Sequence, residues 1–189
     1  MKNRDLFLSA LLVITFSSCT VFSVHPLYDS GNLRTDPRLA GTWKDIGEDE
    51  TFVKITANLD SSYDLSWYEK GDTTWYLVHY LMIGKDYFLD LFPLDKHPYD
   101  GTDLLLKNYV PMHSFLKLEI QNNQAVAYLF DGDKMMSLFR QNRIRLQHEL
   151  MNDYVIITAK TNDLEKFVQK YSGNKEAFSE PTLYRKVVN

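Results

Sequence analysis

The five histidines of the chain are the side chains best suited to proton transfer or metal binding. His79 lies between apolar neighbours, so it could point into a ligand cavity, or it could be a core histidine that bonds a backbone carbonyl. Two other histidines have acidic neighbours, which gives the pairs Asp95 with His97 and His148 with Glu149. A zinc ion needs three or four protein ligands, and each pair supplies only two. The sequence therefore predicts no metal site.

Motifs that mark catalysis or cofactor binding are absent from the sequence. It contains no Gly-x-Ser-x-Gly elbow, no phosphate-binding Gly-Lys-Ser/Thr loop, no dinucleotide fingerprint and no His-Glu-x-x-His. The stretch Asp131-Gly132-Asp133 begins like a calcium loop, but Met135 stands at the next ligand position. We expect a protein that is not an enzyme and that has no cofactor.

Aromatic side chains are abundant, because the 189 residues include 3 Trp, 12 Tyr and 11 Phe. Aromatic rings often line ligand pockets, but in a small β domain they also fill the core. One predicted hairpin carries our candidates for ligand binding, which are Trp75, Tyr76, His79, Tyr80 and Tyr87. Which alternate set faces inward cannot be read from one sequence, because a register shift of one residue exchanges the two faces of a strand.

The N-terminus has the pattern of a secretory signal peptide. Lys2 and Arg4 precede an apolar run over residues 6–16, which is shorter than the roughly 20 residues that a membrane-spanning helix needs. Two serines follow, and then Cys19, the one cysteine of the chain. A single cysteine excludes an intramolecular disulfide and a multi-cysteine metal site.

The stretch Phe16-Ser17-Ser18-Cys19 resembles a bacterial lipobox. The resemblance implies that residues 1–18 are removed as a lipoprotein signal peptide and that lipid is attached to Cys19. Several acyl chains anchor a protein firmly, because each buried CH₂ contributes about 0.8 kcal/mol. The next residue is Thr20 rather than Asp, so the resemblance implies a lipid-anchored protein of the cell envelope, at the outer membrane and facing the periplasm.

Charge and composition limit the partners and the domain organisation. The chain has 21 Lys and Arg against 25 Asp and Glu, so its net charge of −4 gives no overall attraction to nucleic acid. Residues 19–35 contain Pro26 and Gly31 and show no hydrophobic period, which predicts a tether. We expect one folded domain over residues 36–189.

The domain itself is predicted to be mainly β. Short β-branched and aromatic runs alternate with turn residues, which is typical of an antiparallel meander. We expect strands over residues 41–44, 51–56, 63–69, 73–83, 87–92, 113–120, 125–130, 154–159 and 182–188. About eight strands that close into a barrel leave no exposed edge. A helix is expected over residues 162–171, begun by a capping box of Asn162 and Glu165.

The long strand over residues 73–83 indicates how these elements pack. Both of its faces are largely apolar, so both should be covered. We expect one face to line the interior of the barrel and the other to lie under the C-terminal helix.

The stretch Asp36-Pro37-Arg38-Leu39-Ala40-Gly41-Thr42-Trp43-Lys44 resembles the opening of the lipocalins and fatty-acid-binding proteins. In that group a helical turn leads into a Gly-x-Trp on the first strand. The resemblance implies an antiparallel lipocalin-like β-barrel with a C-terminal packing helix. It also implies that Trp43 closes the floor of the barrel and that Arg185, on the last strand, packs over it. A cation over an aromatic ring contributes about 0.5–2 kcal/mol.

The function expected from these observations is non-catalytic binding of a small hydrophobic or amphipathic ligand by a membrane-anchored envelope lipoprotein. This expectation rests on the resemblance and the aromatic strands. The alternative is a filled barrel that serves as an interaction or assembly module for another envelope protein. The volume of the barrel interior discriminates between the two.

Overall fold

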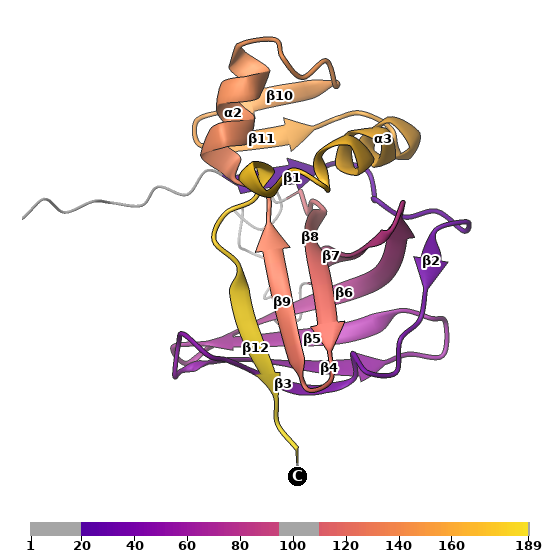
Figure 1. Ribbon diagram of the computed structural model, residues 1–189, viewed down its shortest axis with the longest axis vertical. Helices are drawn as coiled ribbons and strands as arrows, with labels where there is room; N and C mark the ends of the chain where they lie inside the picture. Colours follow the sequence, from indigo (N-terminus) through magenta and orange to yellow (C-terminus); the bar gives the residue numbers. More distant parts are fainter. Residues whose placement is uncertain (1–19, 95–109, 189) are drawn as a thin grey trace, which may run out of the picture.

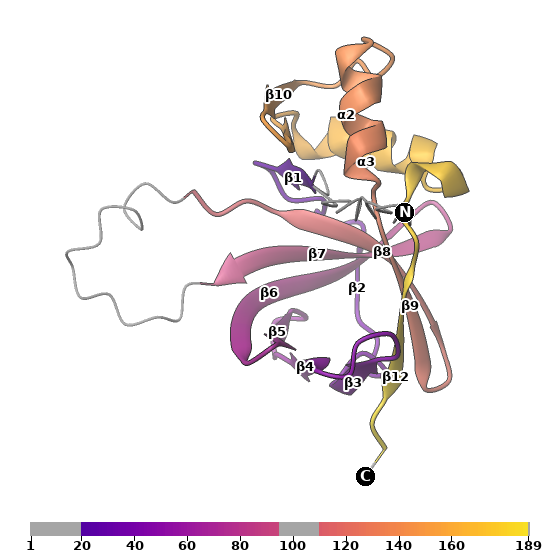
Figure 2. The same ribbon diagram turned by 90° about the vertical axis from the view of Figure 1, so that its left-hand side faces the viewer.

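The computed structural model describes residues 20–94 and 110–188. Within them, eight antiparallel strands form a closed β-barrel (Figures 1 and 2). Each strand pairs with the one before it, and the last pairs with the first. The barrel strands are β3 (Gly41–Asp45), β4 (Thr51–Ala57), β5 (Tyr63–Glu69), β6 (Asp72–Ile83), β7 (Asp86–Leu94), β8 (Ser114–Gln121), β9 (Gln124–Leu129) and β12 (Thr182–Lys186). The prediction of a mainly β, antiparallel barrel fold is confirmed.

Alternation of apolar and polar residues places the strands in the barrel wall. In β4, Thr51, Val53 and Ile55 are buried, whereas Phe52 and Lys54 between them are exposed. Successive side chains of a strand point to opposite faces, so the buried set faces the barrel interior.

A second layer of helices and strands lies against one side of the barrel (Figures 1 and 2). We call it the α/β layer. Its elements are β1 (Thr20–Ser23), α2 (Gly132–Arg140), β10 (His148–Met151), β11 (Tyr154–Ile157), α3 (Thr161–Tyr171) and the 3₁₀ turn η1 (Lys175–Ala177). β11 lies between β10 and β1 in a three-stranded sheet, and β1 runs parallel to β11. A two-residue strand, β2 (Leu33–Arg34), pairs with the end of β6.

Two hydrophobic cores result from this arrangement. The inner core fills part of the barrel and includes Val78 and Tyr80 of β6. The outer core lies between the barrel wall and the α/β layer, and it joins Leu81 and Ile83 of β6 to apolar residues of α3. The barrel interior therefore covers one face of the long strand, and the C-terminal helix covers the other face at Leu81 and Ile83.

The prediction of a tether over residues 19–35 is wrong for the part that the structure describes. Thr20–Ser23 form β1, Val21 is buried, and Leu27 has no exposed surface. β1 pairs with a strand more than 130 residues away in the sequence. Such a partner leaves no local signal, because a four-residue parallel strand needs neither a turn nor an alternating pattern beside it.

The segments between β9 and β12 also differ from the expectation. The strand expected over residues 154–159 exists as β11, but it belongs to the α/β layer rather than to the barrel. The helix expected over residues 162–171 is α3, but it has no capping box. Its N-cap residue is Lys160, and no side chain caps it. The Thr161 hydroxyl instead donates a hydrogen bond to the carbonyl of Pro26 (2.8 Å), which joins the helix to the N-terminal segment.

None of the helices in the described part of the chain is long and apolar enough to span a membrane.

Candidate functional site: the barrel cavity

The inner core leaves a cavity of about 370 Å³ inside the barrel. Ligand sites in proteins are typically about 300–1,000 Å³ and mostly apolar. The walls are apolar and aromatic side chains from all eight barrel strands, among them Val53, Leu65, Trp67, Tyr76, Leu91, Leu116, Ala127 and Tyr184. These residues face inward because they occupy alternate positions along their strands. This arrangement can bury an apolar molecule through nonpolar contacts, without a covalent bond to it.

One end of the cavity is closed by an apolar floor, which consists of Leu39, Trp43, Leu118 and Ile120. The indole N–H of Trp43 donates to the carbonyl of Leu39 (2.8 Å), so the one polar atom of this ring is satisfied within the protein. Trp43 is only 2% exposed. The position of this ring agrees with the floor position that the resemblance implied.

The cation that lies over this floor is Lys186 rather than Arg185. The Nζ atom of Lys186 lies 5.2 Å from the centre of the Trp43 ring and donates to the carbonyl of Arg38 (2.6 Å). The prediction for Arg185 is wrong because Tyr184 and Lys186 occupy the inward positions of β12, which leaves Arg185 between them pointing outward and exposed.

Gly41 makes room for this lysine. A Cβ atom at position 41 would lie 2.6 Å from Cε of Lys186, and the backbone there has a φ of +134°. The φ requires glycine, because L-residues rarely adopt this value, and a Cβ atom would in addition displace the flexible end of the lysine. The Gly-x-Trp pattern thus has a local physical cause in this chain.

The other end of the cavity, which we call the mouth, carries the polar groups. It is formed by Ser114, Ser179, Glu180 and Thr182, where β8 begins and where the chain enters β12. Thr20 and Phe22 of β1 also line it. Glu180 is the one charged side chain among the described residues that line the cavity. The cavity is therefore amphipathic, with an apolar floor and a polar, acidic mouth.

Tyr184 adds a buried polar group to the cavity wall. It is only 8% exposed. Burial raises the pKa of this hydroxyl above its usual value of 10, and the carboxylates of Asp45 and Glu69 raise it further. The hydroxyl therefore stays neutral and can exchange a hydrogen bond with a bound molecule.

The five ligand-binding candidates do not lie together. Tyr76 lines the cavity. Tyr80 and Tyr87 stack on each other at the opposite end of the barrel from the mouth, with ring centres 5.2 Å apart, and neither lines the cavity. Burial raises the pKa of Tyr80 above its usual value. Trp75 and His79 occupy the positions of β6 that alternate with Tyr76, so they lie on the outer face of the barrel wall.

His79 belongs to a polar cluster outside the barrel. Its ring stacks on Tyr28 with centres 3.8 Å apart, and its buried Nδ1 atom has no hydrogen-bond partner in the part of the chain that the structure describes. The interpretation of His79 as a group that points into the cavity is therefore wrong. Burial lowers the pKa of the imidazole below its usual value of 6.5, although the nearby carboxylate of Asp90 opposes this effect.

Asp90 is the centre of this cluster and has no exposed surface. Its carboxylate oxygens bind Nδ1 of His113 (2.7 Å) and accept a hydrogen bond from the backbone N–H of Leu27 (2.7 Å). Asp90 thus joins β7 to the N-terminal segment and to the start of β8. Sequence reasoning missed this residue, although one charged residue within the apolar run of β7 was a visible signal.

Within the described ranges, no group of three or more His, Cys, Asp or Glu side chains could hold a metal ion. The candidate pair Asp95 and His97 lies outside those ranges, and so does Cys19. His148 is half-buried in the α/β layer, where its Nδ1 atom interacts with the carbonyl of Leu146 (2.7 Å). The barrel cavity is consequently the strongest candidate for a functional site.

Comparisons of the chain with protein-family models, with curated proteins and with solved structures found no match.

Proposed function

We propose that this protein binds a small hydrophobic or amphipathic molecule in its barrel cavity and does not transform it. The observation that carries the proposal is the cavity of about 370 Å³, with apolar walls and a polar mouth. Each CH₂ group that moves from water into such a space contributes about 0.8 kcal/mol to binding. An elongated apolar group would lie toward Trp43, with its polar end among the hydroxyls of the mouth.

The same observation bears on the alternative function. A barrel that serves only as an assembly module needs no interior space, and protein cores normally pack with few voids larger than a water molecule. The volume of this cavity favours a ligand over a filled barrel.

Membrane anchoring through Cys19 is the second part of the proposal. The described part of the chain begins at Thr20, and Thr20 and Phe22 line the mouth of the cavity. Lipid on Cys19 would therefore hold the barrel close to the membrane, with the mouth near the bilayer. We place the protein in the cell envelope, at the outer membrane and facing the periplasm, on the basis of the lipobox resemblance and Thr20.

A cavity-filling substitution tests the binding function. Ala127 is buried in the cavity wall, and its neighbour Val126 lies on the outer face of the same strand. Ala127→Phe should reduce binding of the neutral dye N-phenyl-1-naphthylamine at least about tenfold, whereas Val126→Phe should leave it nearly unchanged. Circular dichroism on both variants shows whether the fold is retained. The proposal is wrong if residues 20–189 bind no dye and native mass spectrometry shows only the bare polypeptide mass.

The anchor has its own experiment. Cys19→Ser should abolish incorporation of labelled palmitate into the protein. The cavity function does not depend on this result, because residues 20–94 and 110–188 form the described fold. Incorporation of labelled palmitate into the Cys19→Ser variant would contradict lipid attachment at Cys19 and leave the binding proposal unaffected.

A further inference from the structure

We propose that the cavity selects amphiphiles with a cationic or neutral polar end and rejects those with an anionic one. This inference rests on the proposed function, because it names the class of ligand that the same cavity takes. The observations that carry it are the charge of the mouth, the position of the basic residues and the aromatic rings near the polar end.

The polar end of a bound amphiphile would meet no positively charged side chain among the described residues that line the mouth. The polar side chains that line it are hydroxyls and the carboxylate of Glu180. Recognition of a carboxylate or phosphate normally uses Arg or Lys, and in residues 20–94 and 110–188 no Arg or Lys lines the cavity. An anionic end at this position would lose its water and meet a like charge.

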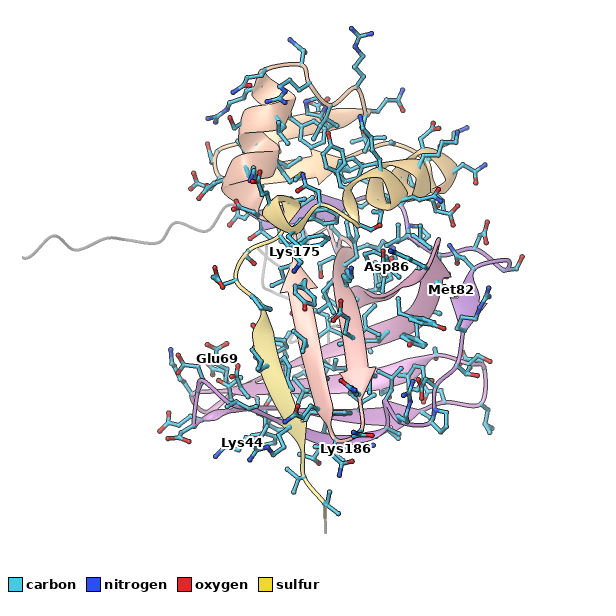
Figure 3. The ribbon with its side chains drawn as sticks, viewed as in Figure 1. Lys44, Glu69, Met82, Asp86, Lys175 and Lys186 are labelled. Carbon is cyan, nitrogen blue, oxygen red and sulfur yellow. The ribbon has the colours of Figure 1, made fainter. Side chains whose placement is uncertain are left out.

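Three basic residues at the ends of the barrel strands already have partners. Lys186 lies over the floor, where it contacts Trp43 and the carbonyl of Arg38. Lys44 pairs with Asp49 (3.3 Å), and Lys70 lies 3.9 Å from Glu69. Figure 3 shows Lys186 at the lower end of β12, whereas Lys44 and Glu69 lie on the left, toward the ends of β3 and β5. Lys175 lies on η1 and is not part of the cavity lining.

The strand ends around the mouth are acidic. The end of β3, the turn that follows it, the β5–β6 turn and residue 180 together carry seven carboxylates and two ammonium groups. These residues are Asp45, Glu48, Asp49, Glu50, Glu69, Asp72 and Glu180, with Lys44 and Lys70. A concentration of one sign of charge at the entrance of a low-dielectric cavity attracts cations and repels anions.

Aromatic rings provide a favourable site for a cation inside this acidic entrance. Trp67, Tyr76 and Tyr184 line the cavity, and Trp67 lies two residues before the mouth end of β5. Quaternary ammonium groups bind between such rings through cation–π attraction. The neutral hydroxyl of Tyr184 can bind a polar group of an uncharged amphiphile.

Three amphiphiles with the same twelve-carbon chain test the inference. They are dodecyltrimethylammonium, glycerol monolaurate and dodecanoate. The affinity of each is measured by its displacement of N-phenyl-1-naphthylamine from the cavity, below the micelle concentration of the amphiphile. At low salt and pH 7.5 we expect dodecyltrimethylammonium to bind about tenfold more tightly than dodecanoate, with glycerol monolaurate between them. Added NaCl at about 0.5 M should narrow the difference, because salt screens charges at the mouth.

Glu180→Gln is the decisive variant, because Glu180 is exposed and its loss should not affect folding. It should reduce the preference for the cation several-fold and leave the affinity for glycerol monolaurate unchanged. Glu149→Gln, an exposed position on β10 outside the cavity lining, is the matched control and should change nothing.

The outcomes separate the two proposals. Three outcomes would overturn the charge selectivity while the cavity still binds apolar molecules. Dodecanoate could bind as tightly as dodecyltrimethylammonium or more tightly, Glu180→Gln could leave the preference for the cation unchanged, or none of the amphiphiles could displace the dye. Failure of the dye and all three amphiphiles to bind would overturn the proposed function itself.

Discussion

Lys186 lies across the ring of Trp43, with its Nζ atom 5.2 Å from the ring centre, and so covers the floor of the barrel. The same ammonium group donates to the carbonyl of Arg38, which joins the last strand to the turn before the first. This contact explains two features of the local sequence, a lysine two positions after Tyr184 and a glycine two positions before Trp43.

The first prediction concerns this contact. Lys186→Met should lower the free energy of unfolding by about 1–2 kcal/mol, since it removes a cation–π contact and a hydrogen bond. Arg185→Met, on the outer face, should change it by less than about 0.5 kcal/mol. Urea denaturation followed by tryptophan fluorescence measures both. A larger loss for Arg185→Met than for Lys186→Met would contradict the described floor.

A second prediction concerns Asp90. Asp90→Ala should destabilise the protein by about 3 kcal/mol, because it leaves the Leu27 N–H and the His113 ring buried without their partner. Asp49→Ala removes a fully exposed carboxylate and should cost less than about 1 kcal/mol. Chemical denaturation of both variants makes the comparison, and similar losses would show that Asp90 does not join the N-terminal segment to the barrel.

A third prediction concerns the N-terminal segment. Leu27→Ala should cost about 2–5 kcal/mol, because Leu27 is fully buried in the outer core. Val24→Ala, at a position that is 47% exposed, should be nearly neutral. A chain that begins at residue 36 lacks β1 and should lose the α/β layer, which limited proteolysis detects. A stable, protease-resistant chain from residue 36 would instead support a tether.

The fourth prediction is a pH dependence that arises from His79. Burial lowers its pKa in the folded state, so below pH 6.5 the unfolded chain takes up a proton that the folded chain does not. The stabilising effect is complete above pH 6.5 and is lost as the pH falls toward the lowered value. The free energy of unfolding should therefore decrease from pH 7.5 to pH 5.5.

His79→Phe is the variant that isolates this effect, because it keeps the stacking on Tyr28 and removes both the titration and the unpartnered Nδ1 atom. Its free energy of unfolding should decrease less between pH 7.5 and pH 5.5 than that of the unchanged protein. His25→Gln, on an exposed residue outside the cluster, is the control. Parallel curves for His79→Phe and the unchanged protein would refute the prediction.

The sequence by itself determined the class of the fold. Alternation along β4 and in the long strand β6 predicted antiparallel strands, because side chains of a strand repeat every two residues. Trp43 at the head of the first barrel strand indicated the floor. The apolar second face of β6 also correctly predicted a covering helix, since Leu81 and Ile83 needed burial.

Tertiary structure decided which side chains meet. Arg185 and Lys186 are adjacent cations, and only the register of β12 against β3 selects Lys186 for Trp43. Because successive side chains of β6 point to opposite faces, Tyr76 faces the cavity and His79 faces outward. The ligand-binding candidates of one hairpin therefore lie on opposite faces of the barrel wall. The pairing of β1 with β11 and the contact of Asp90 with Leu27 join residues far apart in sequence. Such contacts arise when the chain closes on itself, and a local pattern of residue types does not encode them.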